Sequence, residues 1–336
     1  MTISRNLRVA GLAAFSLSSS VAFAGDLTIY TPQSADRTAV IEELAEAKLG
    51  FDIDFVNMGG GEVYDRVLAE RNNPQADVIF GLIDFLTAGL KQEGLLEKYT
   101  LDALDGLPDI YKDPDGYFYG YRQTPITLSY NTDILSGEEA PQTWEELSDP
   151  KWEGKFMIGA LTWQTTRAIL AGLFTRQIDE TGEMTEEGWD WFAKFYANAV
   201  VFEEGMNRPE MIANGETPLS LNHFLGVQRD AETGGYNYAY IDTEGGTPIV
   251  VERNAILKGT DNMEQALAFL EYVQSVEFQV ENAERFGVIP VHPDAIAQSP
   301  EDVRKSATLL TPQPIDWDLM ARNLDGWLER IQLDLL

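Results

Sequence analysis

The alternation of apolar and polar positions is most regular between residues 51 and 85. Apolar residues alternate with aspartates over 51–56, which is the period of a β-strand. Three glycines follow at 59–61, and from Glu62 to about Arg71 the apolar positions recur with helical spacing. The apolar run 76–80 has turn signals on both sides, which indicates a buried parallel strand. Strand, glycine loop, helix and strand form one βαβ unit.

The same reasoning predicts alternating strands and helices along the rest of the chain, without internal repeats. Further strands are predicted at 27–30, 126–130, 156–158, 219–221, 237–241 and 248–251. Helices are predicted from Ser34 to Gly50 and at 85–93, 141–147, 162–177, 186–198, 223–229, 266–276 and 319–333. On the helix at 186–198, Trp189, Phe192, Ala193 and Tyr196 share one side, a pattern more typical of a core than of a ligand cage. The chain is therefore predicted to be α/β.

Two loops of the βαβ unit are candidates for ligand contact. Met58–Gly61 and Gly81–Asp84 follow neighbouring parallel strands, and open α/β sheets bind ligands beyond the carboxyl ends of such strands. The triple glycine allows two interpretations. The backbone could approach a ligand and present helix N–H groups to an anion, or it could form a plain strand-to-helix turn that requires positive φ.

The first 24 residues are predicted to be a secretion signal. Arg5 and Arg8 precede a short apolar run at 9–17, and Ala22 to Ala24 matches the small-residue cleavage pattern. The run is too short to span a bilayer. We therefore expect an exported periplasmic protein.

Charge and composition exclude several classes of function. The 336 residues carry 24 basic and 55 acidic side chains, a net charge of −31, which disfavours nucleic acid as a partner. There is no cysteine, and the two histidines, His223 and His292, are far apart, so neither a Cys- or His-rich metal centre nor a His-dependent triad is expected. A serine hydrolase would need an elbow such as G-x-S-x-G, which is absent. A secreted hydrolase is the weakest alternative.

A series of short segments resembles the periplasmic solute-binding proteins of bacterial ABC importers. More narrowly, it resembles the group that contains ferric-iron binders and sugar-phosphate and phosphonate binders. The segments occur in the family's order from about Leu27 to Phe286: LTIYTPQS, NNPQADVIFG, ITLSYNTDIL, PQTWEELSDPKWEGK, the stretch 212–216 and NAILKGTDNMEQALAFLEYV.

This resemblance implies a two-lobe periplasmic-binding-protein fold (type II) with a ligand cleft between the lobes. Two hinge strands would cross between the lobes near 124–131 and 248–257. Lobe one would comprise 25–125 with a return at about 256–296, and lobe two 126–255. The C-terminal tail at 297–336 is not assigned to a lobe. Hinge closure would trap the ligand.

The sequence departs from the ferric-iron relatives at the positions that hold the metal. Their paired tyrosines follow an Asn-His pair, whereas here Asn222-His223 is followed by Phe224-Leu225. Their first-lobe histidine and glutamate are also missing, at YTPQSAD and at 82–84. Ferric iron prefers hard anionic oxygens, which Phe and Leu do not offer. No metal site and no cofactor are predicted.

The resemblance to binders of phosphorylated ligands suggests a site made of amides, hydroxyls and helix N-termini. Candidate residues for this site are Thr31, Gln33, Ser34, Gly59, Gly60, Gly61, Gly81, Thr162, Trp163, Gln164, Thr165, Asn207, Arg208, Asn222, His223 and Glu244.

Three of these candidates, and Arg122 near a hinge strand, keep a second interpretation. Trp163 could stack on a flat ligand or be a packing residue. Arg208 and Arg122 could pair with an anion or be ordinary solvated arginines. Glu244 could bind an amine or be a solvated turn acid, so a cationic or zwitterionic ligand stays open.

The predicted function is that of the substrate-binding component of an ABC importer, not of an enzyme. It would capture a small anionic organic solute, phosphorylated or phosphonate-like, by lobe closure. The alternatives are a ferric-iron or an amine-binding protein of the same fold. The expected partners are the small-molecule ligand and an inner-membrane permease with its ATPase, and the protein is expected to be a monomer.

Overall fold

The computed structural model describes residues 27–336, so the predicted signal peptide at 1–24 lies outside the described residues. The N-terminal part alternates strands and helices, and β1 pairs in parallel with β2 and with β3. We call this part, with the elements packed on it, the first half: β1 (Leu27–Thr31), α1 (Ala35–Leu49), β2 (Ile53–Asn57), α2 (Gly60–Ala69), β3 (Val78–Ile83) and α3 (Asp84–Gln92).

Local sequence explains these elements. Helix α1 ends at Gly50, which has φ +78°, a conformation that glycine adopts without steric cost. Helix α2 buries Val63 and Val67, and every residue of β3 is buried, as expected for a central parallel strand. The prediction of a loop at Gly81–Asp84 was wrong. β3 continues to Ile83 and α3 begins at Asp84, because the apolar run extends further than the glycine suggested.

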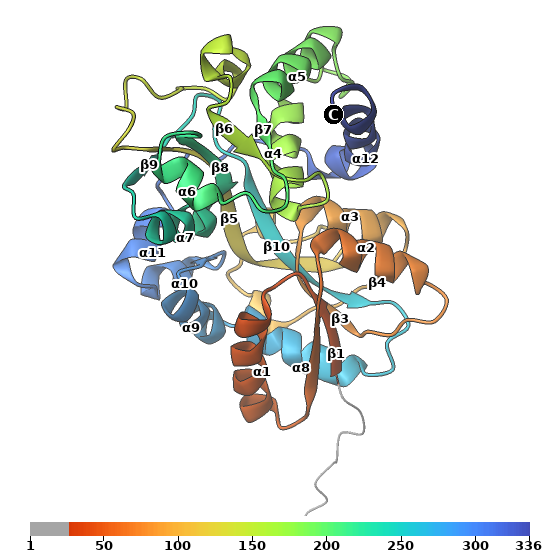
Figure 1. The fold of residues 1–336 in the computed structure, drawn as a ribbon. Helices are drawn as coiled ribbons and strands as arrows, with labels where there is room; N and C mark the ends of the chain where they lie inside the picture. The colour runs from red at the N-terminus through yellow and green to blue at the C-terminus, as the bar shows by residue number, and fades with distance from the viewer. Residues whose placement is uncertain (1–26) are drawn as a thin grey trace, which may run out of the picture.

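Two long strands run through the middle of the sheet, β5 (Phe118–Asn131) and β10 (Ile249–Leu257). They pair antiparallel with each other, and β10 also pairs with β3 while β5 pairs with β8 (Leu219–His223). The sheet order is β2-β1-β3-β10-β5-β8-β6-β7. In Figure 1 the remaining elements gather in two groups at opposite ends of β5 and β10. Both crossing strands were predicted.

The second group, which we call the second half, surrounds the parallel strands β6, β7 and β8. Phe192 on α5 is fully buried and packs on Phe174 of α4 with ring centroids 4.5 Å apart, which confirms the core interpretation of the aromatic residues. Ala193 was wrongly placed on this side, because it lies at the edge of the buried face and is exposed. The further elements of this half are β6 (Phe156–Ile158), α4 (Gln164–Thr175), α5 (Glu186–Asn198), β7 (Val200–Val201), α6 (Arg208–Ala213), α7 (Phe224–Gly234) and β9 (Tyr238–Tyr240).

The C-terminal segment returns to the first half. The buried face of α8 packs into the same core as β1, β2 and β3, and β11 pairs with β5. The elements are α8 (Met263–Gln274), α9 (Val276–Phe286), β11 (Ile289–Pro290), α10 (Pro293–Gln298), α11 (Glu301–Ser306) and α12 (Trp317–Asp334).

Helix α12 contacts both halves (Figure 1). Trp317 stacks on Phe85 of α3 with ring centroids 6.1 Å apart, and Trp327 lies 4.9 Å from Phe174 of α4. The tail that the sequence left unassigned therefore packs across both, and the lobe boundaries remain predictions.

Short elements complete the chain. Instead of the helix predicted at 141–147, a 3-10 turn forms at Glu145–Ser148, and the Thr143 hydroxyl accepts from the Glu146 N–H at 3.2 Å. The other short elements are β4 (Leu96–Glu97) and 3-10 turns at Asp102–Leu104, Asp109–Tyr111 and Pro150–Trp152. None of the helices described in residues 27–336 has the length and apolar character needed to cross a bilayer.

Candidate functional site

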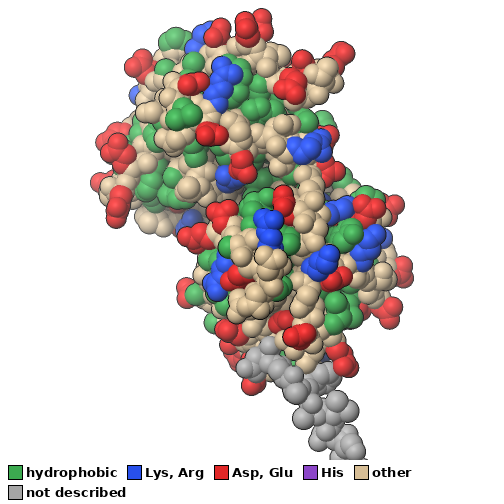
Figure 2. Space-filling model, turned by 90° about the vertical axis from the view of Figure 1, so that its right-hand side faces the viewer, with side chains coloured by type: hydrophobic (Ala, Val, Ile, Leu, Met, Phe, Trp, Pro, Cys, Tyr) green, Lys and Arg blue, Asp and Glu red, His purple; other side chains and the backbone are tan. Residues whose placement is uncertain are grey.

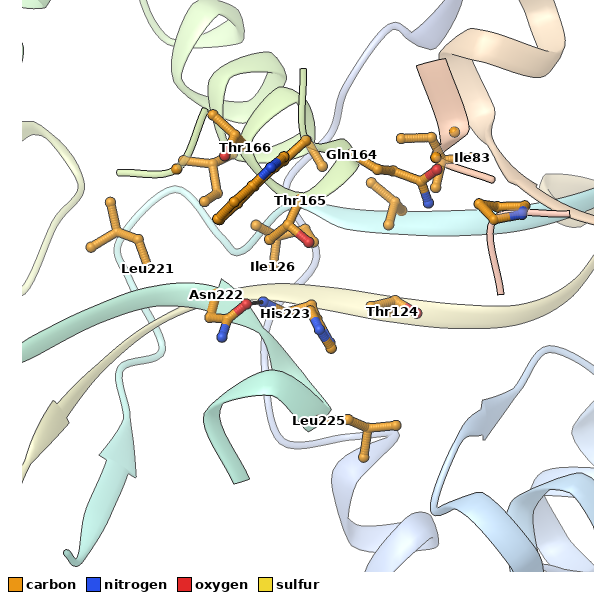
Figure 3. Close-up of a pocket in the computed structure, with 18 of the residues that line it drawn as sticks. Ile83, Thr124, Ile126, Gln164, Thr165, Thr166, Leu221, Asn222, His223 and Leu225 are labelled. Atoms are coloured by element: carbon orange, nitrogen blue, oxygen red, sulfur yellow. Dashed lines mark hydrogen bonds between the residues drawn. The ribbon is translucent and has the colours of Figure 1, made fainter. Parts of the chain in front are cut away.

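A cavity of about 770 Å³ lies between the two halves and is lined by residues from both. In Figure 3, Thr124 and Ile126 of β5 lie between the beginning of α4 and the end of β8, where Asn222 and His223 stand. Among the predicted ligand residues, those that line the cavity are Gln33, Ser34, Gly59, Gly60, Thr162, Trp163, Gln164, Thr165, Arg208, Asn222 and His223.

The other predicted residues do not line this cavity. Thr31 is fully buried and its hydroxyl donates to the Phe80 carbonyl at 2.8 Å, so it joins β1 to β3. Gly81 has φ +80°, and its N–H donates to the Asn254 side chain at 3.1 Å. Both residues support the frame on which the cavity is built.

Asn207, Glu244 and Gly61 also lie outside the lining. The Asn207 side chain caps α6 by accepting from the Glu210 N–H. Glu244 lies exposed in a turn, where its carbonyl accepts from Arg176 at 3.2 Å. The position of Glu244 therefore does not favour a role in binding an amine.

Three side chains form a closed ring at the floor of the cavity. The Arg122 Nη2 donates to Gln33 Oε1 at 2.8 Å and lies 2.6 Å from Glu252 Oε1. Gln33 Nε2 donates to Glu252 Oε2 at 2.7 Å, which closes the ring. Thr124 adds a hydroxyl donor to Glu252 at 3.1 Å. Glu252 is thus saturated with donors, and its charge is offset by Arg122.

Arg37 is a lining residue that the sequence analysis missed. It stands in the first turn of α1, and only 8% of its surface is exposed. Its Nη2 donates to Asn282 at 2.9 Å, while its Nε has no hydrogen-bond partner and no carboxylate lies within ion-pair distance in the described part of the chain. Burial, and then the positive charge of Arg122, lower the pKa of the Arg37 guanidinium to about 10. Arg37 is therefore a buried cation at neutral pH that feels the negative charge of Glu252 but makes no direct ion pair with a carboxylate among those residues.

The wall from the second half combines a helix N-terminus with aromatic rings. No acidic residue occupies the first turn of α4, and Trp163, its N-cap residue, makes no side-chain cap bond, so the start of this helix faces the cavity with its positive dipole end (Figure 3). Trp163 is 40% exposed and lies 4.8 Å from the Phe202 ring between centroids. A ligand in the cavity meets both N–H donors and a flat aromatic face.

His223 stands at the N-terminus of α7, where its Nδ1 accepts from the Gly226 N–H at 3.1 Å. Burial, followed by the positive charges of Arg229, Arg122 and Arg208, lowers the pKa of His223 to about 3. The imidazole is therefore neutral at neutral pH. Arg208 pairs with Asp230 at 2.8 Å.

The charged side chains that line the cavity are four arginines and one glutamate: Arg37, Arg122, Arg208, Arg229 and Glu252. The whole chain has the opposite balance, with 55 acidic and 24 basic residues, and acidic side chains are scattered over the face shown in Figure 2. The cavity is therefore a local region of positive charge in a negatively charged protein, suited to an anion.

A family model described as bacterial extracellular solute-binding protein matches residues 39–311. The chain belongs to this family. It is also 42% identical to a probable ABC transporter periplasmic-binding protein of Sinorhizobium fredii over 314 residues, covering 94% of this chain and 87% of that protein. The predicted class is thereby confirmed: a periplasmic solute-binding component of an ABC transporter, in a family of binding proteins and not enzymes.

Solved structures confirm the fold of this solute-binding protein. Iron-bound HitA from Pseudomonas aeruginosa has a TM-score of 0.79 at 21% identity, covering 92% of this chain and 99% of that one. AfuA from Actinobacillus pleuropneumoniae, with fructose-6-phosphate bound, has a TM-score of 0.75 at 23% identity, also covering 92% and 99%. The predicted α/β periplasmic-binding-protein fold is confirmed.

Within residues 27–336 of this solute-binding protein, no three His, Asp or Glu side chains converge as a metal site would require. At the positions where the ferric-iron relatives were expected to carry tyrosines, Phe224 stacks on Tyr240 at 4.6 Å and Leu225 lines the cavity.

The sequence analysis missed three charged lining residues, Arg37, Arg229 and Glu252. A usable signal existed for Glu252, because the polar run Glu252-Arg253-Asn254 interrupts an otherwise apolar strand, and charges at such positions are usually paired.

Proposed function

We propose that this protein captures a small anionic organic solute between its two halves and delivers it to an inner-membrane permease and its ATPase. The observation that carries the proposal is Arg37, a buried arginine on the cavity wall without a carboxylate partner in the described chain. A buried charge is costly unless it is paired, so an anionic ligand would supply the missing partner.

The residues around Arg37 offer several further hydrogen-bond donors, which favours an anion that carries more than one acceptor oxygen. Arg122 and the uncapped start of α4 reach the same cavity, and Thr165 stands in the first turn of that helix. A phosphorylated or phosphonate-like solute offers several acceptor oxygens for such donors. Trp163 and Phe202 would contact its carbon skeleton.

The alternatives have less support from the lining residues. An amine would need a free carboxylate, but Glu252 is already bonded to Arg122, Gln33 and Thr124. Ferric iron would need anionic oxygens, and Leu225 presents an alkyl chain to the cavity. The strongly negative charge of the chain argues against nucleic acid as a partner, and we propose that the protein acts as a monomer.

A thermal-shift experiment on refolded protein tests the proposal. Inorganic phosphate, fructose 6-phosphate and uncharged fructose serve as probes, because binding to the native state alone raises the melting temperature. Arg37→Met should abolish or strongly reduce any shift that an anion causes, since a hydrogen bond to a charged group contributes about 1.5–3 kcal/mol, or roughly 10- to 150-fold in affinity.

The matched control is Arg285→Met, which removes an exposed arginine paired with Glu281 on α9. It should leave the anion-induced shift intact. A shift with fructose but not with either anion, or an anion-induced shift that survives Arg37→Met unchanged, would contradict the proposal.

A further inference from the structure

The start of α2 in the first half touches the start of α4 in the second half. A Cβ atom added to Gly60 would lie 2.0 Å from Gln164 Oε1 and 3.1 Å from Gln164 Cδ. In Figure 3, Gln164 extends from α4 toward Ile83 of the first half. Gln164 Oε1 is buried and has no hydrogen-bond partner among the described residues. The two walls of the cavity are therefore in direct contact at Gly60.

Only one of the three consecutive glycines is in this contact. At Gly59 a Cβ would meet its nearest atom, Glu62 Oε2, at an ordinary 3.5 Å. At Gly61 the nearest atom is the Thr162 carbonyl oxygen at 4.0 Å. None of the three has a positive φ, so the backbone conformation does not require glycine at these positions. At Gly60 the requirement is space for Gln164.

An anion-binding role for this helix start has no comparable support. The Glu62 side chain accepts from the Gly59 N–H at 2.8 Å and places a carboxylate at the N-terminus of α2. That negative charge already occupies the position an anionic ligand would take, and it would repel one.

The halves also approach each other elsewhere along the cavity. A Cβ added to Gly287, at the end of α9, would lie 3.6 Å from the Leu225 side chain, which lines the cavity from α7. Gly287 has φ +64° and ends its helix, so it is glycine for a conformational reason as well. In this structure the walls therefore touch at Gly60, and at Gly287 they are separated by about the width of a methyl group.

We infer that Gly60 is a positioning residue for closure: its missing side chain allows α2 to approach Gln164, and this approach sets the closed state of the cleft. A side chain at this position would either displace the end of the Gln164 side chain from its place between the walls or hold the walls apart, and both outcomes would disfavour closure on a ligand. The effect on ligand affinity rests on the proposed function, whereas the contact itself does not.

Distance measurements between spin labels test this inference. The chain has no cysteine, so Ala69→Cys on α2 and Ala193→Cys on α5, both exposed, give two unique labelling sites. The distance distribution is recorded without ligand and with inorganic phosphate, in the otherwise unchanged chain, in Gly60→Ala and in Gly60→Ala/Gln164→Ser. Gly61→Ala and Gln164→Ser alone are the matched controls.

The short distance should be populated in the unchanged chain and in Gly61→Ala. In Gly60→Ala its population relative to the open form should fall by about tenfold, the effect expected of overpacking, and Gln164→Ser should restore it in the double variant. Both glycines lie in a helix, where alanine is the better helix former, so neither single substitution should unfold the protein.

The inference fails if Gly60→Ala keeps the short distance as populated as in the unchanged chain, or if Gln164→Ser does not restore it. It also fails if the unchanged chain never adopts the short distance, with or without phosphate. A short distance that responds to Gly60→Ala but not to phosphate would leave the inference standing, and would count only against phosphate as a ligand of the proposed function.

Discussion

Arg122 on β5 and Glu252 on β10 stand directly opposite each other in the register of these two strands, and an ion pair of 2.6 Å joins them. Gln33, from the loop after β1, bridges the pair on the cavity side. The two strands that cross between the halves and a loop of the first half are therefore connected by one polar ring. We expect this ring to contribute to stability and to hold Arg122 ready for an anion.

Removing one member of the pair should cost more than removing both. Glu252→Gln leaves a buried guanidinium without a carboxylate and should lower the free energy of unfolding by about 3–5 kcal/mol. The double variant Arg122→Met/Glu252→Leu should be less destabilised than that, since neither member of the pair is left behind as an unpaired buried charge. Urea unfolding of the single and double variants measures both values. Additive losses in the double variant would show that the pair does not act as a unit.

Acid should destabilise the protein through His223. The pKa of His223 is about 3 in the folded chain, whereas an unfolded histidine titrates near 6.5, so between these values only the unfolded chain binds the proton. The free energy of unfolding should therefore fall as the pH is lowered below 6.5, by roughly 1.4 kcal/mol for each pH unit.

His223→Asn isolates this effect, because asparagine can also cap α7 but does not titrate. Urea unfolding at pH 7 and pH 5 should show a smaller loss in His223→Asn than in the unchanged chain. Equal losses would mean that other groups account for the acid sensitivity.

Trp163 should report on occupation of the cavity. It is exposed on the cavity wall next to Phe202, whereas Trp144 and Trp152 are buried. Any anion that raises the melting temperature should therefore also change the tryptophan emission, and Trp163→Phe should remove most of that change. Trp317→Phe on α12, which does not line the cavity, is the control and should retain it. Signal loss in the control but not in Trp163→Phe would place binding elsewhere.

Two glycines with similar backbone conformations should respond differently to alanine. Gly246 has φ +89°, and a Cβ there would lie 2.8 Å from the backbone of Pro312 and Gln313. Gly205 has φ +95°, but nothing lies within 4 Å. Gly205→Ala should cost about 1 kcal/mol for strain alone, and Gly246→Ala should cost about 1–3 kcal/mol more. Thermal unfolding compares them, and equal losses would show that the backbone at 312–313 moves away without cost.

Much of the fold could be predicted because local patterns specify it. The helix at 186–198 was predicted with its observed ends, since Thr185 caps it and its apolar positions recur with helical spacing. The strand at 156–158 was also predicted as observed. By contrast, α9 was not predicted, although Ser275 caps it, because its apolar face is short and follows directly on α8.

The site could be predicted only in part, because burial depends on contacts that are distant in sequence. Nothing in the sequence around Arg37 distinguishes it from an exposed helix residue. Its burial comes from contacts with Asn282 and Phe286, more than 240 positions later. Thr31, in contrast, is a hydroxyl residue at the end of a strand next to the cavity, as a ligand residue would be, yet its hydroxyl donates to the Phe80 carbonyl instead. Sequence reasoning located the loops around the cavity but could not orient their side chains.

The position of β10 in the sheet has a consequence for how the chain is made. β10 lies between β3 and β5, but it is synthesised long after both, since β3 ends at Ile83 and β10 begins at Ile249. Until then the edge of β3 has no partner on that side, and pairing requires the closure of a very long loop. The N-terminal part is therefore kept from completing its core early. This delay suits a chain that must cross a membrane before it folds.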